Sequence, residues 1–322
     1  LHWDSGWFEN FPTDKTNCMT KYTRIWEQLC DAFEDYNDYL IFESQNEELG
    51  WSSLWNRWGG TEGKAESYAL ANEINQTFVD VVRSSGGNNP QRHLLISGYN
   101  TDIELTCDPL FKMPVDPANR MAVSVHYYTP AGFAILEEDA DWGKASSTWG
   151  TDAEIAELER NMDLMKTTFA DKGIPVIIGE YGCPKKNKEE ASVRKFISSV
   201  CKEAYTRGMC PVLWDITDLH YDRKNCKMFD EEMLNSMMSV KPEEMPTEPT
   251  KPTEPPASEI IMGDVNADGE YTVADIVLLS NWLLGKEINL KNWEATDFYD
   301  DDVIDVYDLC LARYQLIKIS SR

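Results

Sequence analysis

Short apolar runs alternate with longer amphipathic segments through the first 240 residues. The apolar runs predict strands at 39–43, 93–98, 121–128, 174–179 and 210–214. The segments between them have apolar residues at three-to-four spacing and predict helices at 19–34, 64–85, 152–172, 189–207 and 230–239. The opening residues, LHWDSGW, predict the tail of a further strand that ends at His2. This alternation is typical of a parallel sheet with helical crossovers, so the predicted fold class is α/β.

Polar or aromatic residues follow nearly every predicted strand: His2, Glu47, Asn100, His126, Tyr128, Glu180 and Trp214. A (β/α)8 barrel gathers its active site from the carboxyl ends of several strands at one face. A doubly wound sheet would instead show a glycine-rich phosphate turn after its first strand, and the sequence shows none. The pattern therefore favours a barrel.

Two of the predicted strands run into a glutamate. The stretch Ile174 to Gly182, IPVIIGEYG, carries Glu180 at the end of an apolar run, and Tyr39 to Glu47, YLIFESQNE, ends on Glu47. A carboxylate at the edge of a hydrophobic core is partly desolvated, which costs free energy unless the group is hydrogen-bonded or has a catalytic role. Glycoside hydrolysis uses a pair of carboxyl groups that flank the glycosidic bond. Glu43 is the rival within the second stretch, as a buried structural carboxylate.

Composition narrows the classes of partner. The chain has 30 basic and 56 acidic residues, a net charge of -26, which argues against nucleic acid or an anionic membrane as partner. The sequence has no apolar run long enough to span a membrane. Its eight cysteines are scattered without a CxxC pair, so no zinc site is implied, and both free thiols and one or two disulfides stay open. The chain starts Leu1-His2 with no visible signal peptide, and we expect its N-terminus to be cut.

A change of composition at Lys241 marks a boundary between domains. Residues 241–258, KPEEMPTEPTKPTEPPAS, contain six prolines and no aromatic residue, which is typical of an extended spacer. We therefore expect a first domain at 1–240, a linker at 241–258 and a second domain at 259–322.

The second domain contains an internal repeat with calcium-loop spacing. Its first copy has oxygen ligands at loop positions 1, 3, 5 and 12 and a glycine at position 6, Gly269. Position 7, which binds through its main chain in such loops, is also counted, so the candidate ligands are Asp264, Asn266, Asp268, Glu270 and Asp275.

The second copy starts 33 residues later, at Asp297. It is poorer, because Tyr299 replaces the ligand at position 3 and Asp302 replaces the glycine. Its candidate ligands are Asp297, Asp301, Asp305 and Asp308. Helices are expected after both loops, at 274–284 and 307–317.

With these motifs in view, the chain resembles two known families. Residues 1–240 resemble a glycoside hydrolase family 5 catalytic domain of the endo-β-glucanase (cellulase) type, and the last 60 or so resemble a type I dockerin. The first resemblance implies a (β/α)8 TIM barrel, here lacking its first strands because the N-terminus is truncated. The second implies a small all-α, calcium-binding module with two EF-hand-like loops.

The first resemblance also implies an activity and roles. The family cleaves β-1,4-linked glucans with retention, with Glu47 as acid/base and Glu180 as nucleophile. His2, Asn46, His126, Tyr128 and Trp214 would bind the sugar at the scissile bond, with Trp214 as its stacking floor. No cofactor is expected for catalysis. The family usually has Asn-Glu-Pro at the acid, whereas Glu48 stands in place of the proline here.

Alternatives on the same barrel are a xyloglucanase, a mannanase or a xylanase, because the carboxyl pair fixes the bond chemistry and not the sugar. A non-catalytic carbohydrate-binding component is the alternative from another class. The dockerin resemblance implies a cohesin module of a scaffolding protein as partner, Ca²⁺ in the loops, and a secreted, extracellular, cellulosome-associated enzyme. Val273, Ala274, Val306 and Tyr307 match the family's partner-contact positions.

Overall fold

The computed structural model of the chain describes residues 1–2, 6–48, 54–58, 62–216, 218–240, 261–286, 288, 290–298 and 303–320. The chain divides into two compact units, Leu1–Pro242 and Glu243–Arg322. The predicted linker at 241–258 lies outside the described residues.

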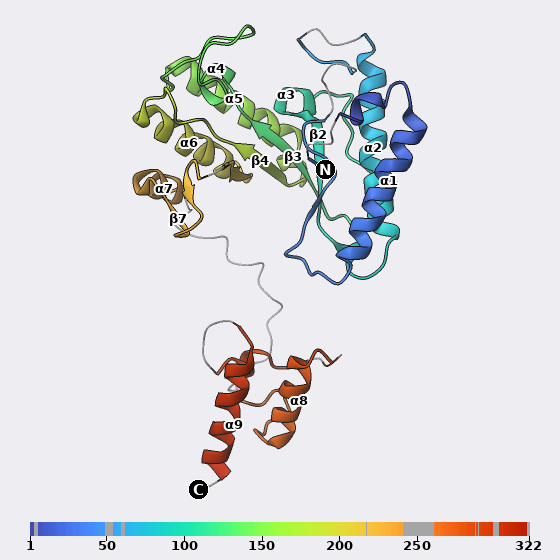
Figure 1. The fold of residues 1–322 in the computed structure, drawn as a ribbon, viewed down its shortest axis with the longest axis vertical. Coiled ribbons are helices and arrows are strands. Elements are labelled where there is room, and N and C mark those ends of the chain that lie inside the picture. Colours follow the sequence, from blue (N-terminus) through green and yellow to red (C-terminus); the bar gives the residue numbers. More distant parts are fainter. Residues whose placement is uncertain are drawn as a thin grey trace. The chain divides into compact units, whose positions relative to one another are not determined.

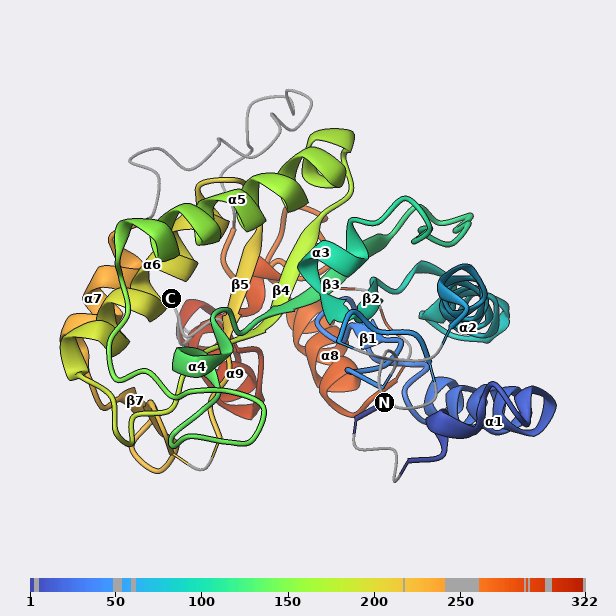
Figure 2. The same ribbon diagram turned by 90° about the horizontal axis from the view of Figure 1, so that it is seen from above.

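A parallel sheet of five strands forms the centre of the first unit, with the strands in chain order (Figure 1). The strands are β1 (Phe42–Glu43), β2 (Leu94–Asp102), β3 (Met121–Tyr127), β4 (Val176–Tyr181) and β5 (Cys210–Leu213). The sheet curls with its helices on the outside, like half of a barrel wall (Figure 2). This confirms the α/β class, and the sheet is open, with β1 and β5 at its edges.

The long helices cover the outer face of this sheet. They are α1 (Lys15–Ala32), α2 (Lys64–Ser84), α5 (Asp152–Thr168), α6 (Glu190–Tyr205) and α7 (Glu231–Met238). Helix α1 packs on α2, and α6 packs on both α5 and α7. The shorter elements are α3 (Ile103–Thr106), α4 (Ala131–Ala134), the 3-10 turns Phe8–Asn10, Asn89–Gln91 and Ala170–Lys172, and the antiparallel pair β6 (Tyr221–Asp222) and β7 (Lys227–Met228).

The predicted strand at 39–43 is wrong in extent. Only Phe42 and Glu43 pair with β2, and Tyr39 is 97% exposed. The buried guanidinium of Arg92 explains this, because its N–H groups bond the carbonyl oxygens of the preceding loop instead of leaving them for a strand partner. The acceptors are the carbonyls of Phe33, Tyr36, Asn37 and Leu40.

The predicted strand tail before His2 is also wrong. Leu1 and His2 lie outside any strand, although the carbonyl of Leu1 accepts a hydrogen bond from the N–H of Asn46 at 2.7 Å. Strand β4 begins two residues later than predicted and continues through Tyr181, so Glu180 lies within the strand and not after it. Apolar character marks the buried part of a strand, whereas backbone pairing extends beyond it.

The helix predictions hold within a few residues. Helix α1 starts four residues early because its first three residues, Lys15, Thr16 and Asn17, are polar and exposed and leave no periodic signal. Of the two expected caps of α5, Thr151 is the one used, and it forms a capping box with Glu154. None of the helices in the described ranges is both long and apolar enough to cross a bilayer. All eight cysteines are free thiols.

The second unit is a helical pair around a small core. It contains α8 (Val273–Leu283), α9 (Val306–Ser320) and the 3-10 turn Glu294–Thr296. The core consists of Val265, Ile276, Leu279, Leu309 and Ala312. The phenol of Tyr271 donates to the carbonyl of Ala312 at 2.5 Å and ties the first loop to α9. Both predicted helices are confirmed, each beginning one residue earlier than expected.

Candidate active site

Strands β3 and β4 set two of the predicted site residues side by side. His126 of β3 and Glu180 of β4 are direct partners in the parallel register. The register shifts just before His126 on β3 and between Ile178 and Tyr181 on β4. Such irregularities turn side chains away from the regular alternation and are frequent next to active sites.

Gly179 allows this close approach. A Cβ atom built at this position would lie 3.0 Å from Oγ of Ser124 and 3.7 Å from Nε2 of His126. The Cβ atom of an alanine would therefore crowd the Ser124 hydroxyl and would lie at ordinary contact distance from the His126 ring.

A buried polar network places Glu47. Oγ of Ser44 donates to Oδ1 of Asn75 at 2.8 Å, and the side-chain amide of Asn75 donates to the carbonyl of Ser97 at 3.0 Å. The hydroxyl of Ser97 donates to the carbonyl of Gln45, and the phenol of Tyr22 donates to the carbonyl of Ser44 at 3.0 Å. These bonds join α1, α2 and β2 to the segment after β1, and so fix the direction in which Glu47 leaves the sheet.

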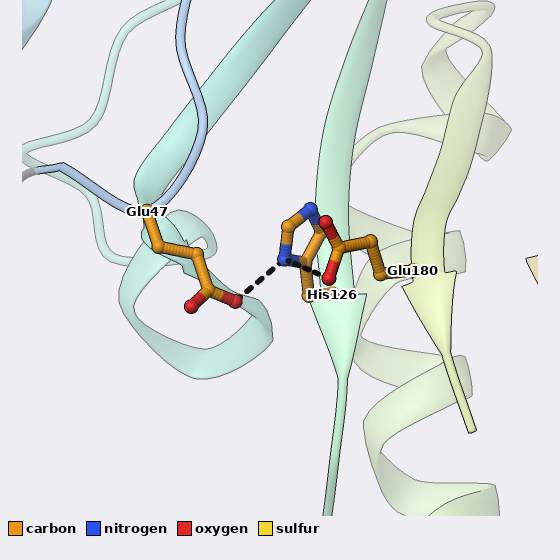
Figure 3. A group of neighbouring side chains, drawn as sticks. All are labelled: Glu47, His126 and Glu180. Carbon is orange, nitrogen blue, oxygen red and sulfur yellow. Dashed lines mark hydrogen bonds and ion pairs between the residues drawn. The ribbon is translucent and has the colours of Figure 1, made fainter. Parts of the chain in front are cut away.

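Glu47, His126 and Glu180 form one compact group (Figure 3). Nδ1 of His126 lies 2.6 Å from Oε1 of Glu47 and 3.5 Å from Oε2 of Glu180. One oxygen of each carboxyl group and one nitrogen of the ring all lie within 4.8 Å of one another. The imidazole stands between the two glutamates, of which Glu47 comes from the segment after β1 and Glu180 from β4 (Figure 3).

Three further predicted residues complete the group. The hydroxyl of Tyr128 donates to Oε2 of Glu180 at 2.9 Å. Nε2 of His2 lies 3.8 Å from Oε1 of Glu180, and the His2 ring stacks on Trp214 with centroids 6.1 Å apart. The stacked rings of His2 and Trp214 therefore lie beside Glu180.

The two glutamates differ in environment. The Glu180 side chain is 13% exposed, whereas that of Glu47 is 35% exposed. Burial raises the pKa of Glu180, and the charge of His126 and the hydrogen bond from Tyr128 oppose this rise. Contacts from these two neighbours thus favour the ionised form of Glu180 inside a partly closed site.

The contacts described above join six of the predicted residues, Glu47, His126, Glu180, Tyr128, His2 and Trp214. Asn46 lies directly before Glu47 and is half-buried, with its N–H bonded to Leu1. Glu43, the rival of Glu47, lies in β1, where its backbone pairs with Leu95 of β2, and it is not part of the group formed by Glu47, His126 and Glu180.

Sequence reasoning missed residues that line a cavity beside Glu47, among them Arg57 and Asn161. Asn161 lies on the buried face of α5, three residues after Leu158 and four before Met165. A polar residue at an apolar position of a helix was the one signal that could have marked it.

The candidate calcium loop is folded around buried carboxylates. Asp264 is 5% exposed and accepts the N–H groups of Asp268 and Gly269 at 3.0 and 2.8 Å. Asp275 is fully buried and accepts the N–H groups of Val265 and Thr272. The all-oxygen donor set of Asp264, Asn266, Asp268, the main chain of Glu270 and Asp275 fits a hard cation such as Ca²⁺.

The second loop is described in part. Asp308 is fully buried and accepts the N–H of Asp305 at 2.8 Å. Asp297 ends the 3-10 turn at 294–296 as its C-cap residue. Asp301 lies outside the described residues.

Residues 1–219 match the model of a protein family described as cellulase (glycosyl hydrolase family 5). The chain belongs to this family. The curated relatives include endoglucanase B of Clostridium cellulovorans, 30% identical over 294 residues, which cover 88% of this chain and 63% of the relative. The xyloglucan-specific endo-β-1,4-glucanase BoGH5A of Bacteroides ovatus is 32% identical over 242 residues, or 69% of this chain and 47% of the relative.

Solved family 5 structures have the same fold. A GH5-4 broad specificity endoglucanase from an uncultured bovine rumen ciliate superposes with a TM-score of 0.61 and 34% identity, covering 70% of this chain and 66% of that structure. The chain spans less than two thirds of the length of the two curated relatives.

Proposed function

We propose that this protein is a retaining endo-β-1,4-glucanase that hydrolyses cellulose or mixed-linkage β-glucan. The observation that carries the proposal is the pair Glu47 and Glu180, with carboxyl oxygens within 4.8 Å of one another and His126 between them. Retaining glycosidases hold their carboxyl groups about 5–5.5 Å apart, and inverting enzymes hold them roughly 6.5–9.5 Å apart. The short separation supports a double displacement.

In the first step, an oxygen of Glu180 attacks the anomeric carbon while Glu47 gives its proton to the departing glycosidic oxygen. In the second step, Glu47 takes a proton from water, whose oxygen displaces Glu180 from the anomeric carbon and releases the sugar. The exposures fit these roles, because Glu180 is the more enclosed and Glu47 the more open to water.

Neighbouring side chains support the nucleophile. The Tyr128 hydroxyl donates to Glu180 at 2.9 Å, which stabilises the carboxylate that must attack. Trp214 and His2 offer stacked rings beside Glu180, where the sugar that becomes bonded to the enzyme would lie. Aromatic faces against a sugar ring bind it by its apolar C–H surface.

Xyloglucan is the second candidate substrate. The relative from Bacteroides ovatus is named as xyloglucan-specific, and it matches this chain at 32% identity. The same glutamate pair would cleave either backbone, so the choice depends on the walls of the cleft.

The second unit is proposed to be a dockerin that attaches the enzyme to a cohesin module, as part of a secreted cellulosome. The buried carboxylates of Asp264 and Asp275 in an oxygen-rich loop support bound Ca²⁺. Val273 and Val306 at the starts of α8 and α9 are 67% and 59% exposed, which suits a recognition patch.

Release of reducing ends from soluble mixed-linkage β-glucan by the full chain tests the catalytic proposal. Xyloglucan, mannan and xylan serve as parallel substrates. Glu180→Gln should abolish release, whereas Glu138→Gln, which changes an exposed glutamate of the same unit, should retain it. Activity of Glu180→Gln at the wild-type level would remove Glu180 as nucleophile, and an inverted first product observed by NMR would overturn the double displacement.

A further inference from the structure

A buried histidine outside the catalytic group connects the segments that follow β4 and β5. His220 is 2% exposed and comes after β5 in the chain. Its Nε2 atom lies 3.0 Å from the carbonyl oxygen of Cys183, two residues after β4. A carbonyl oxygen can only accept a hydrogen bond, so Nε2 carries the ring hydrogen and donates it. Burial lowers the pKa of His220, which keeps the ring uncharged at neutral pH.

The main chain of His220 is fixed as well as its ring. Its N–H donates to Oδ1 of Asp215 at 2.5 Å, and its carbonyl oxygen accepts the N–H of Phe229 at 2.9 Å. Together with the bond to Cys183, these contacts hold the residue from three segments, which follow β4, β5 and β7. His220 can therefore keep the ends of β4 and β5 at a set distance from each other.

Trp214, the residue directly after β5, depends on such support. Among the strands that the structure describes, β5 pairs with β4 alone, and the paired residues end with Leu213 and Tyr181. One more backbone bond follows, from the N–H of Trp214 to the carbonyl of Tyr181 at 2.8 Å. Beyond this bond, the direction in which the chain leaves the sheet is set by the contacts of the next residue, Asp215.

Asp215 fixes the backbone just after the tryptophan. Its Oδ1 atom accepts the N–H groups of His220 and Tyr221 at 2.5 and 3.1 Å, and its carbonyl oxygen accepts the guanidinium of Arg223 at 2.7 Å. Hydrogen bonds from N–H groups to a carboxylate are among the stronger ones in proteins. His220 joins this turn to the segment after β4, because its ring reaches Cys183.

The two segments lie in direct contact. A Cβ atom built at Gly182 would lie 3.3 Å from the carbonyl oxygen of Trp214, which is closer than most such contacts. Gly182 also lies only two residues after Glu180. A shift of the turn after β5 therefore changes the position of the tryptophan relative to the proposed nucleophile.

His220 acts on the site from outside the cleft. It lines a separate cavity of about 340 Å³, together with residues that include Phe229 and Met233. The Trp214 ring is the proposed floor under the sugar that becomes bonded to Glu180. A misplacement of about 1 Å in an active site can cost about 100-fold in rate.

We propose that His220 is a positioning residue that sets the place and tilt of the Trp214 ring beside Glu180, through its bonds to Cys183 and Asp215. This inference rests on the proposed glucanase function.

Two replacements of His220 separate its hydrogen bond from its packing. Leucine fills the space without a donor, whereas the side-chain amide of glutamine can donate in place of Nε2. We expect His220→Leu to lower kcat/KM for soluble β-glucan about tenfold, and His220→Gln to recover most of this loss. His93→Leu, at an exposed histidine, should leave kcat/KM unchanged. A His220→Leu enzyme with wild-type kcat/KM would overturn the proposal.

A double-mutant cycle with Trp214→Ala shows whether His220 acts through the tryptophan. In the Trp214→Ala background, His220→Leu should lower kcat/KM by about twofold or less, because the ring that it positions is gone. The same loss in both backgrounds would overturn the proposal. Asp215→Asn weakens the other bond of His220 and should couple to Trp214→Ala in the same way, so it supplies the cycle if His220→Leu does not fold.

Binding of cellotetraose to Glu180→Gln, measured by calorimetry, distinguishes this proposal from the glucanase proposal. On this background His220→Leu and Trp214→Ala should each weaken binding, and both together should weaken it no more than Trp214→Ala alone. That result supports the positioning role even if the wild type hydrolyses no β-glucan, which would overturn the glucanase proposal. Independent losses that multiply in the combined variant would overturn the positioning role.

Discussion

Nδ1 of His126 lies 2.6 Å from Oε1 of Glu47, so one hydrogen bond joins the two groups. With the ring hydrogen on Nδ1, His126 donates this bond to Oε1 and leaves Oε2 to carry the proton that Glu47 gives to the leaving oxygen. After that transfer the same N–H stabilises the carboxylate that must next accept a proton from water. The histidine thus serves both states of the acid/base residue.

Replacing His126 should slow catalysis without unfolding the protein. We expect His126→Ala to lower kcat/KM for β-glucan by about 100-fold, within the usual contribution of a group that assists proton transfer. His93→Ala is the matched control, because His93 is exposed. Steady-state kinetics with equal circular dichroism spectra would measure this, and a His126→Ala enzyme with wild-type kcat/KM would contradict the role.

Tyr128→Phe should shift the acidic limb of the pH profile. The Tyr128 hydroxyl donates to Glu180 and lowers its pKa, so its removal raises that pKa further. The nucleophile must be ionised, and the acidic limb of kcat/KM therefore moves to higher pH. Tyr205→Phe at the exposed end of α6 should leave the limb in place, and a limb that moves to lower pH in Tyr128→Phe would rule out this coupling.

Glu180→Gln should stabilise the fold in a pH-dependent way. Burial raises the folded-state pKa of Glu180 above its unfolded value, so the stability associated with its neutral form is present at acidic pH and is lost as pH rises through the folded pKa. The side-chain amide of the variant carries no charge, so the variant does not lose this stability as pH rises. The melting temperature of the variant should exceed that of the wild type at neutral pH, with the gap closing in acid.

A Glu180→Gln variant that is less stable than the wild type at neutral pH would show that the ionised group is favoured in the fold.

Gly98→Ala should destabilise the first unit. A Cβ atom at this position would lie 1.9 Å from Oγ1 and 2.7 Å from Cγ2 of Thr106 in α3, which is closer than real contacts allow. We expect a loss of about 3 kcal/mol in urea unfolding, since this core is close-packed. Thr106→Ala should relieve part of the loss when combined with Gly98→Ala, and additive losses would mean that the two residues do not clash.

Calcium removal should affect the second unit alone. Calorimetry with calcium and with a chelator should show a lower melting temperature of this unit without the metal, because a ligand present at 100 times its Kd stabilises by about 2.7 kcal/mol. Asp264→Ala should lose this response, whereas Glu294→Gln, outside the loop, should keep it. Hydrolysis of β-glucan should stay constant, and a melting temperature unaffected by chelation would contradict calcium binding.

The catalytic pair could be predicted because its signal is local. An apolar strand that runs into a carboxylate is visible in nine residues around Glu180 and again around Glu47. The extent of β1 could not be predicted, because the carbonyl groups before it are bound by Arg92, which lies 50 residues further along the chain than Phe42. The cavity wall was hidden for the same reason, since Arg57, Asp102 and Asn161 come from three separate elements.

Strand β1 is two residues long and lies at an edge of the sheet, whereas β4 lies between β3 and β5. Beyond the buried polar network of Ser44, Asn75 and Ser97, the start of the segment that carries Glu47 is held to β2 by a short ladder that includes the bonds from the N–H of Phe42 to the carbonyl of His93 and from the N–H of Ser44 to the carbonyl of Leu95. Opening free energies are lowest where few ladder bonds must break. On heating, the acid/base residue should therefore exchange its amide hydrogens and lose its position before the nucleophile does, so the enzyme would stop turning over while most of its fold is still intact.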